Sequence, residues 1–147
     1  MSTEWDIRFI DLANHIGGWS KDQSRRVGCV VTGPLREIRA VGYNGFPRGA
    51  DETVSNRNIS PDKYLWTEHA ERNAIFQAAR IGVALEGCTM YLSWFPCMAC
   101  ARAVVQSGIT RLVAVEPDLR DPRWGSEFAA ALALFREAAI TLELSAA

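Results

Sequence analysis

The stretch 67–115 reads TEHAERNAIFQAARIGVALEGCTMYLSWFPCMACARAVVQSGITRLVAV. Apolar residues recur at helical spacing over 67–80 and 97–106, and each of these segments is followed by a short, strand-like apolar run, at 90–93 and 112–115. Strands separated by single helices favour parallel pairing on one sheet, with the helices as crossovers. This alternation decides the fold class, because it predicts an α/β domain.

A β-hairpin is predicted before this stretch. Residues 27–32 form a β-branched run, Gly33-Pro34 forms a turn, and residues 38–43 form a second strand-like run. The connection is too short for a crossover helix, so these two strands are antiparallel. The sheet is therefore expected to be mixed.

Helices are expected near both ends of the chain. Thr3 can cap a first helix, and Ser126 can cap a last helix, 126–138, that leads into a strand at 140–144. The expected order is αββαβαβαβ, which gives a mixed five-stranded sheet in a three-layer α/β/α domain. Residues 1–147 contain no repeat, low-complexity segment or linker, so we expect one domain.

Composition and charge narrow the class of protein. Of the 147 residues, 48% are hydrophobic and 22% are charged, which is typical of a globular domain. Sixteen Lys and Arg nearly cancel seventeen Asp and Glu, so nucleic acid is not an expected partner. The polar start with Glu4 and Asp6 is unlike a signal peptide, and no apolar run approaches the roughly 20 residues of a membrane span. We therefore expect a cytoplasmic protein without a membrane partner.

Metal-ligating residue types stand at the start of two predicted helices. His69 lies at the first, and the segment PCMAC at 96–100 opens the second. Zinc accepts imidazole and thiolate in tetrahedral geometry, and two thiolates with one neutral imidazole balance its charge while leaving a fourth position for water. The free N–H groups and the dipole of a helix N-terminus favour the thiolate forms of Cys97 and Cys100. These three residues are the predicted ligands of a catalytic zinc.

Glu71 is the predicted catalytic residue. It lies two residues beyond His69 and would point differently from it on a helix, toward the water rather than the metal. A carboxylate in this place can carry protons. With water activated by zinc, the reaction it supports is hydrolytic deamination, in which water attacks an amino-bearing ring carbon and ammonia leaves.

Taken singly, each motif is compatible with a different role. The PCMAC segment could be a redox pair or half of a structural zinc site. A structural site needs a fourth protein ligand, and a redox pair needs no upstream histidine, so the two motifs together favour catalysis. Cys29 and Cys88 lie in apolar strand-like runs and are expected to be buried and inert.

The two motifs resemble those of the cytidine and deoxycytidylate deaminase superfamily, and most closely those of deoxycytidylate deaminases. His-Ala-Glu followed by Pro-Cys-x-x-Cys is a known signature of zinc deaminases. The similarity covers roughly residues 5–115. The matching segments are Ser20-Lys21-Asp22, Val27-Gly28, Gly42-Tyr43-Asn44-Gly45, Lys63-Tyr64, His69-Ala70-Glu71 with Asn73-Ala74-Ile75, Phe95-Pro96-Cys97 and Gln106-Ser107-Gly108-Ile109.

This resemblance implies a cytidine-deaminase-like fold, a Zn²⁺ cofactor and a small-molecule nucleotide or nucleoside substrate, with conversion of dCMP to dUMP as the best expectation. It also implies that Asn44 hydrogen-bonds the sugar, that the 45–66 loop closes over the nucleotide, and that the chain forms a homo-oligomer. Three positions depart from the pattern. Trp19 stands where such deaminases can carry a basic residue, Glu68 stands where cysteine is common, and the segment 117–124 is also different.

Further substrate contacts are suggested by residue type alone. Lys21, Arg26 and Arg48 are candidates for binding a phosphate, on charge and loop position. Aromatic side chains can hold a heterocycle by stacking, and the candidates are Trp66, Trp94, Phe95 and Trp124.

Three other functions stay open from the sequence. The same chemistry could act on a nucleoside, a free base or another amino-heterocycle. An RNA-editing deaminase would need a basic surface, which the near-neutral charge does not supply. A non-catalytic zinc-stabilised interaction module would have no use for the carboxylate of Glu71 beside His69.

Overall fold

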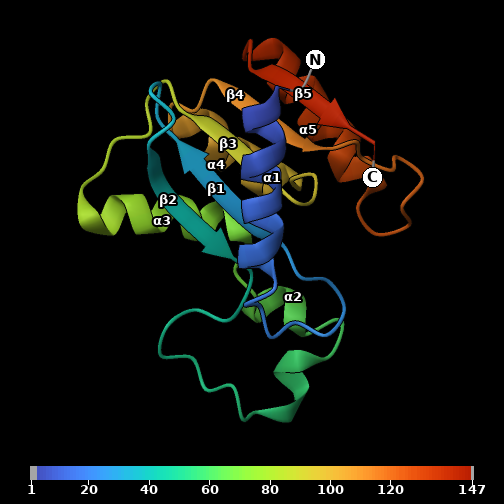
Figure 1. The fold of residues 1–147 in the computed structure, drawn as a ribbon. Coiled ribbons are helices and arrows are strands. Elements are labelled where there is room, and N and C mark those ends of the chain that lie inside the picture. The colour runs from blue at the N-terminus through green and yellow to red at the C-terminus, as the bar shows by residue number, and fades with distance from the viewer. Residues whose placement is uncertain (1–2, 147) are drawn as a thin grey trace.

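The computed structural model describes residues 3–146 and leaves residues 1, 2 and 147 outside. In this part of the chain, five strands form one sheet that is flanked by helices (Figure 1). In chain order the elements are α1 (Glu4–Gly17), β1 (Gly28–Thr32), β2 (Ile38–Tyr43), the 3-10 helix η1 (Ser55–Asn58), α2 (Lys63–Trp66), α3 (Ala70–Ile81), β3 (Thr89–Leu92), α4 (Met98–Gln106), β4 (Arg111–Val115), α5 (Gly125–Glu137) and β5 (Thr141–Ser145). The predicted order is confirmed, and η1 and α2 add short helices to the 45–66 segment.

The sheet is mixed, as predicted. Its strand order is β2-β1-β3-β4-β5. β1 pairs antiparallel with both β2 and β3, while β3, β4 and β5 are mutually parallel. All five residues of β1 are buried, because this strand has a neighbour on each side and helices over both faces. Its sequence, Gly-Cys-Val-Val-Thr, therefore has small or apolar residues on both faces and does not alternate between apolar and charged residues.

Helices cover both faces of the sheet and complete three layers. α1 lies in front of the sheet in Figure 1, where Phe9 and Ile16 join Val30, Tyr91 and Val113 in one apolar cluster. α3, α4 and α5 pack on the opposite face and share a larger cluster with it. None of the described helices is long and apolar enough to cross a membrane.

The start of α3 lies directly on β2. A Cβ atom at Gly42 would come within 2.3 Å of the carbonyl oxygen of Ala70 and 2.6 Å of the amide nitrogen of Ala74, so only glycine permits this approach. Ala70 and Ala74 are themselves fully buried. α4 follows β3 after a short turn and packs beside α3. The N-termini of the two helices therefore lie together at one end of the sheet.

α3 begins three residues later than predicted. The backbone N–H of Glu68 donates to the carbonyl oxygen of Gly45 at 2.8 Å, and the N–H of Gly45 donates to the carbonyl oxygen of Glu68 at 3.0 Å. This pair of bonds keeps the chain extended up to His69, which becomes the N-cap residue. The difference matters for function, because it places His69 at the helix end rather than inside the first turn.

The prediction that Ser126 caps the last helix is wrong. α5 begins at Gly125, and its N-cap residue is Trp124. The Oδ1 atom of Asp121 accepts hydrogen bonds from the backbone N–H groups of Arg123 and Trp124, at 2.8 Å each. Asp121 therefore turns the chain into the helix, and Ser126 lies within the first helical turn.

Candidate active site

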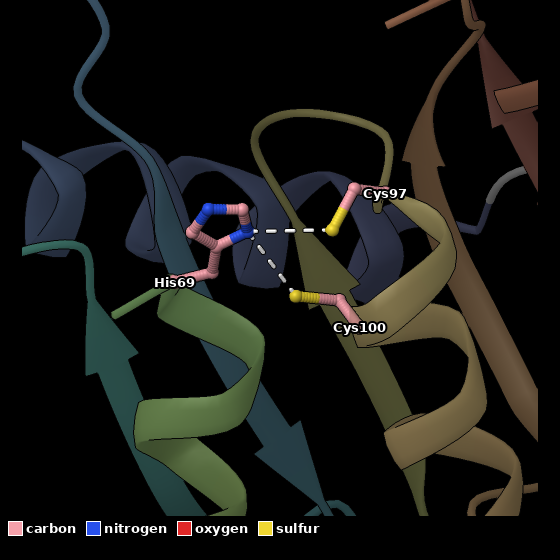
Figure 2. A group of neighbouring side chains, drawn as sticks. All are labelled: His69, Cys97 and Cys100. Atoms are coloured by element: carbon pink, nitrogen blue, oxygen red, sulfur yellow. Dashed lines mark hydrogen bonds between the residues drawn. The ribbon is translucent and has the colours of Figure 1, made fainter. Parts of the chain in front are cut away.

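Three side chains of metal-ligating type converge where α3 and α4 begin (Figure 2). His69 is the N-cap residue of α3, Cys97 is the N-cap residue of α4, and Cys100 lies in the first turn of α4. The Nδ1 atom of His69 lies 3.4 Å from the Sγ atom of Cys97 and 3.3 Å from the Sγ atom of Cys100. Figure 2 shows all three pointing into the space between the two helices.

These three residues fit a tetrahedral zinc ion. Zn–S bonds of about 2.3 Å and Zn–N bonds of about 2.0–2.1 Å at the tetrahedral angle put the donor atoms about 3.6 Å apart, close to the observed separations. The three donor atoms all lie within 4.8 Å of one another, and no fourth His, Cys, Asp or Glu of residues 3–146 joins the group. A set of three protein ligands is typical of catalytic rather than structural zinc.

The charges of the cluster are arranged to receive a cation. Hydrogen bonds from Cys100 and His69 lower the pKa of Cys97 to about 4, although burial opposes this shift. The hydrogen bond with Cys97 raises the pKa of His69 to about 9. The same thiolate, together with burial, raises the pKa of Cys100. Two negative sulfurs therefore repel each other without a cation, whereas a bound divalent ion makes both thiolates and a neutral imidazole stable.

Glu71 lies beside the cluster without belonging to it. It is in the first turn of α3, is 4% exposed, and lines the same cavity as His69 and Cys97. Burial raises its pKa to about 6, and the charge of His69 opposes this shift in part. A buried carboxyl group with a pKa near neutrality can both take and give a proton.

A cavity of about 340 Å³ opens over the cluster and Glu71. This volume lies within the range typical of small-ligand sites. The Trp124 ring meets the His69 ring edge-on, with 5.9 Å between centroids, and meets the Tyr64 ring in the same way at 5.8 Å. The other aromatic members of the wall are Trp94, Phe95 and Phe128. Aromatic side chains thus line the space next to the metal ligands, where a flat heterocycle can pack.

Asn44 lines this cavity, but its side chain also holds the backbone. Its Oδ1 atom accepts a hydrogen bond from the N–H of Val27 at 2.8 Å, and its Nδ2 atom donates to the carbonyl oxygen of Arg25 at 2.8 Å. The side-chain amide retains one further N–H for a ligand. Asn44 therefore combines a structural contact with a place on the cavity wall.

The three predicted phosphate contacts lie elsewhere. Lys21 pairs with Glu52 at 2.9 Å and borders a neighbouring cavity. Arg26 is exposed and donates from Nε to the carbonyl oxygen of Asp22 at 3.2 Å. Arg48 is exposed, and neither it nor Arg26 lines the cavity. The structure thus does not bring these residues to the metal cluster.

Three other cations line the cavity instead: Arg25, Lys63 and Arg123. Lys63 belongs to the Lys63-Tyr64 segment, which resembles the deaminases, so the sequence alone could have indicated it as a site residue. Nothing in one sequence separates Arg25 or Arg123 from the other twelve arginines, because their place depends on how distant loops meet.

Three of the four aromatic candidates, Trp94, Phe95 and Trp124, line the cavity as predicted. Trp66 does not, and the guanidinium of Arg57 lies 3.6 Å from its ring centre.

Comparison with known proteins identifies the relatives of this chain. The family model described as the cytidine and deoxycytidylate deaminase zinc-binding region matches residues 3–116. A protein of Aliivibrio fischeri, named as an uncharacterized deaminase in the luxG 3′ region, is 39% identical over 144 residues, covering 95% of this chain and 92% of its own. Deoxycytidylate deaminase of Mus musculus is 33% identical over 143 residues, covering 94% and 78%.

The fold has a close counterpart among solved structures. The dCMP deaminase of cyanophage S-TIM5, solved in complex with dCMP and dUMP, superposes with a TM-score of 0.79 over 99% of both chains, at 19% identity. At this identity the likeness shows the fold alone. Because the family model spans most of the sequence and the His69, Cys97 and Cys100 cluster has the donor set that zinc requires, the chain belongs to the cytidine and deoxycytidylate deaminase family of zinc-dependent hydrolases.

Proposed function

We propose that this protein deaminates a pyrimidine nucleoside 5′-monophosphate and converts dCMP and water to dUMP and ammonia. The observation that carries the proposal is the placement of Glu71, which is buried beside the zinc ligands on the wall of one cavity without being a ligand. The substrate is suggested by relatives such as deoxycytidylate deaminase of Mus musculus and Homo sapiens, both 33% identical.

Glu71 would move the protons of this reaction. Zinc, when bound by His69, Cys97 and Cys100, lowers the pKa of a water molecule and so supplies the nucleophile. Glu71 would take one proton as the water oxygen bonds to C4 of the ring and deliver it to the ring nitrogen N3. It would then move the second proton, from the hydroxyl group now on C4, to the exocyclic amine. The bond between C4 and this amine breaks as the C4–O bond becomes a carbonyl, and ammonia leaves. Burial of Glu71 suits this role, because its raised pKa of about 6 lets it hold a proton between transfers.

The cationic part of the wall favours a nucleotide over a nucleoside. The guanidinium of Arg25 lies 3.6 Å from the ring centre of Trp94, and that of Arg123 lies 3.6 Å from the ring centre of Tyr64. No carboxylate of the described residues forms an ion pair with either arginine. Both guanidinium groups are thus available to bind a phosphate, which arginine binds with two parallel hydrogen bonds. We propose them as phosphate ligands, and Asn44 as a ligand of the sugar.

A substrate panel tests the proposal. Purified protein with zinc is incubated with dCMP, CMP, deoxycytidine and cytosine, and both ammonia and the deaminated product are measured. We expect the highest kcat/KM with dCMP. A preference for deoxycytidine, cytosine or an unrelated heterocycle would refute the nucleotide assignment, and no turnover of any amino-heterocycle would favour a non-catalytic zinc module. Strong, salt-dependent binding of RNA would favour an RNA-editing deaminase.

We also propose a cytoplasmic homo-oligomer. None of the four cysteines, all of which the structure describes, is paired in a disulfide, which is typical of proteins in reducing compartments. Exposed apolar side chains on β2 and α3, which pack on each other, offer a surface for a second copy, and they include Ile38, Phe76 and Ile81. Light scattering of the purified protein measures the number of subunits, and a monomer at all concentrations would refute this assembly.

A further inference from the structure

A buried ion pair lies on the cavity wall beyond the metal ligands. Lys63, the first residue of α2, is 9% exposed, and its Nζ atom lies 3.3 Å from both carboxylate oxygens of Asp22. Burial raises the pKa of Asp22, but hydrogen bonds from two backbone amides and the charge of Lys63 lower it on balance, so the carboxylate is ionised. Lysine is almost never buried without a partner, so Asp22 is what permits this position of Lys63.

Asp22 also builds the turn that carries Arg25. Its Oδ1 atom accepts hydrogen bonds from the backbone N–H groups of Ser24 at 2.7 Å and Arg25 at 3.0 Å. On the other side, the carbonyl oxygen of Arg25 accepts the hydrogen bond from Asn44. Both the N–H and the carbonyl oxygen of Arg25 are therefore held by side-chain hydrogen bonds, and its guanidinium lies over the Trp94 ring.

Lys63 belongs to the long 46–66 segment, which projects from the body of the molecule below the sheet in Figure 1. A second link between this segment and the 20–27 region is the ion pair of Lys21 and Glu52, whose side chains are 83% and 51% exposed. Exposed pairs of this kind contribute little. In contrast, the side chains of Lys63 and Asp22 are only 11% and 12% exposed, so their attraction is weakly screened by solvent.

We propose that Asp22 and Lys63 are positioning residues for the reaction, because their ion pair fastens the 46–66 segment to the 22–27 turn and so fixes Arg25 where the substrate phosphate binds. The role of Arg25 rests on the proposed function, whereas the fastening itself does not. Both residues also line a neighbouring cavity of about 490 Å³, so the pair stands between the two spaces. Loss of the pair would loosen both segments.

Kinetics of paired variants test this role against direct phosphate binding by Lys63. The Asp22→Asn substitution keeps a side-chain oxygen that can accept the hydrogen bonds of the turn, but it removes the negative charge that faces Lys63. We expect Asp22→Asn and Lys63→Met each to raise the KM for dCMP by about tenfold and to change kcat less, with the double variant no worse than the poorer single one. If Lys63 bound phosphate directly, Asp22→Asn would free its ammonium and lower the KM, which would overturn the proposal.

The conservative variant and a second substrate separate positioning from general damage. Lys63→Arg keeps the charge and can bind the carboxylate with its fork, so it should recover most of the KM for dCMP. A KM as poor as that of Lys63→Met would contradict the ion-pair role. Deoxycytidine, which lacks the phosphate that Arg25 receives, should show little change in KM in any of these variants, and an equal loss with both substrates would also contradict it.

Hydrogen exchange tests the fastening without any substrate. In zinc-loaded Lys63→Met, we expect amides in 22–27 and in 46–66 to exchange at least about tenfold faster than in the unaltered protein. The matched control is Lys21→Met, which removes the only other lysine and the exposed pair with Glu52, and residues 22–27 should then exchange normally. Unchanged exchange in Lys63→Met would overturn the inference. Absence of dCMP turnover by the unaltered protein would refute the proposed function and leave the exchange result unaffected.

Discussion

At the scale of single residues, metal binding and proton transfer are assigned to different side chains at the N-termini of α3 and α4. His69, Cys97 and Cys100 supply donors of the kind and number that a catalytic zinc needs, and Glu71 stands outside this set. Its 4% exposure removes water that would otherwise compete for its protons. Substitution of a zinc ligand should therefore lower the metal content, whereas substitution of Glu71 should lower the rate and leave the metal content unchanged.

Glu71→Gln should retain zinc and lose turnover. Glutamine keeps the size and hydrogen-bonding shape of the side chain but cannot accept a proton. One positioned group that transfers protons contributes about 10²–10⁴-fold, and Glu71 serves more than one transfer, so we expect kcat to fall by about 10⁴-fold or more. Metal analysis and steady-state kinetics on the same preparation check this. Glu68→Gln, the same change three residues earlier, lies outside the cavity lining and should lose less than about tenfold. Loss of zinc in Glu71→Gln would instead make Glu71 a ligand.

Arg123→Gln should weaken binding of the nucleotide and leave the nucleoside unaffected. The side chain then keeps its polarity but lacks the charged fork, and hydrogen bonds to charged groups are worth about 1.5–3 kcal/mol, or roughly 10- to 150-fold in KM for dCMP. Arg120→Gln is the control, because Arg120 is 92% exposed and does not line the cavity. An unchanged KM for dCMP, or an equal rise with deoxycytidine, would remove Arg123 from the phosphate site.

At the scale of elements, α1 is fastened to the sheet by charge as well as by apolar contact. Asp6 accepts two hydrogen bonds from the guanidinium of Arg111 on β4, at 2.8 Å each, and one from the hydroxyl of Tyr91 on β3 at 3.1 Å. It also completes a capping box with Thr3, whose capping role is confirmed. The Arg111 hydrogen bonds are the main reason that the pKa of Asp6 lies well below its usual range.

Asp6→Asn should lower the free energy of unfolding by about 2–4 kcal/mol near neutral pH, because Arg111 loses its partner in a poorly solvated place. The folded-state pKa of Asp6 is depressed, so its contribution is complete above its unfolded value of about 3.9 and is lost as pH falls toward the folded value. The difference between variant and unaltered protein in urea unfolding should therefore shrink between about pH 5 and pH 2. Asp11→Asn, on the exposed side of α1, should cost less than about 0.5 kcal/mol. A pH-independent difference would contradict the ion-pair account.

Gly28→Ala should destabilise the contact of α1 with β1. An added Cβ atom would lie 1.8 Å from the carbonyl oxygen of Ala13 and 2.5 Å from the amide nitrogen of Gly17, and neither backbone group can yield as a flexible side chain would. We expect a loss of about 3 kcal/mol or more in urea unfolding. Gly45→Ala is the matched control, since nothing lies within 4 Å of its added atom, and a similar loss in both variants would contradict the packing argument.

The sequence predicted elements better than their ends. Periodicity and turn residues placed every strand within a residue or two. For the central strands β1, β3 and β4 the signal is strong, because burial between two helical layers requires apolar runs of that length. The start of α3 was misplaced because the bridge between Gly45 and Glu68 is a contact over more than twenty residues. The Ser126 cap was misplaced because Asp121, five residues earlier, already turns the chain.

At the scale of the whole molecule, the zinc ligands and Glu71 could be named from local motifs, but the cavity could not. His69, Cys97 and Cys100 are identifiable by residue type and spacing at helix starts. The cationic wall is assembled from three distant segments, the loops at 22–27 and 121–124 and the start of α2 at 63–64, and no local sequence pattern predicts that these segments meet. Arg26 was predicted from the sequence as a phosphate ligand, but its neighbour Arg25 is the residue that lines the cavity. The turn formed by Asp22 determines which of the two arginines points inward.

Zinc added back to the metal-free protein, with dUMP formation from dCMP and the melting temperature followed together, tests the zinc-dependent deaminase most directly. Because the ligands come from two helices, the metal should stabilise the fold as well as supply the chemistry. We predict that turnover is absent without metal, rises in proportion to zinc, and levels off at one equivalent per chain, with the melting temperature rising in parallel. Full turnover by the metal-free protein, or no turnover of dCMP once one equivalent is bound, would contradict it.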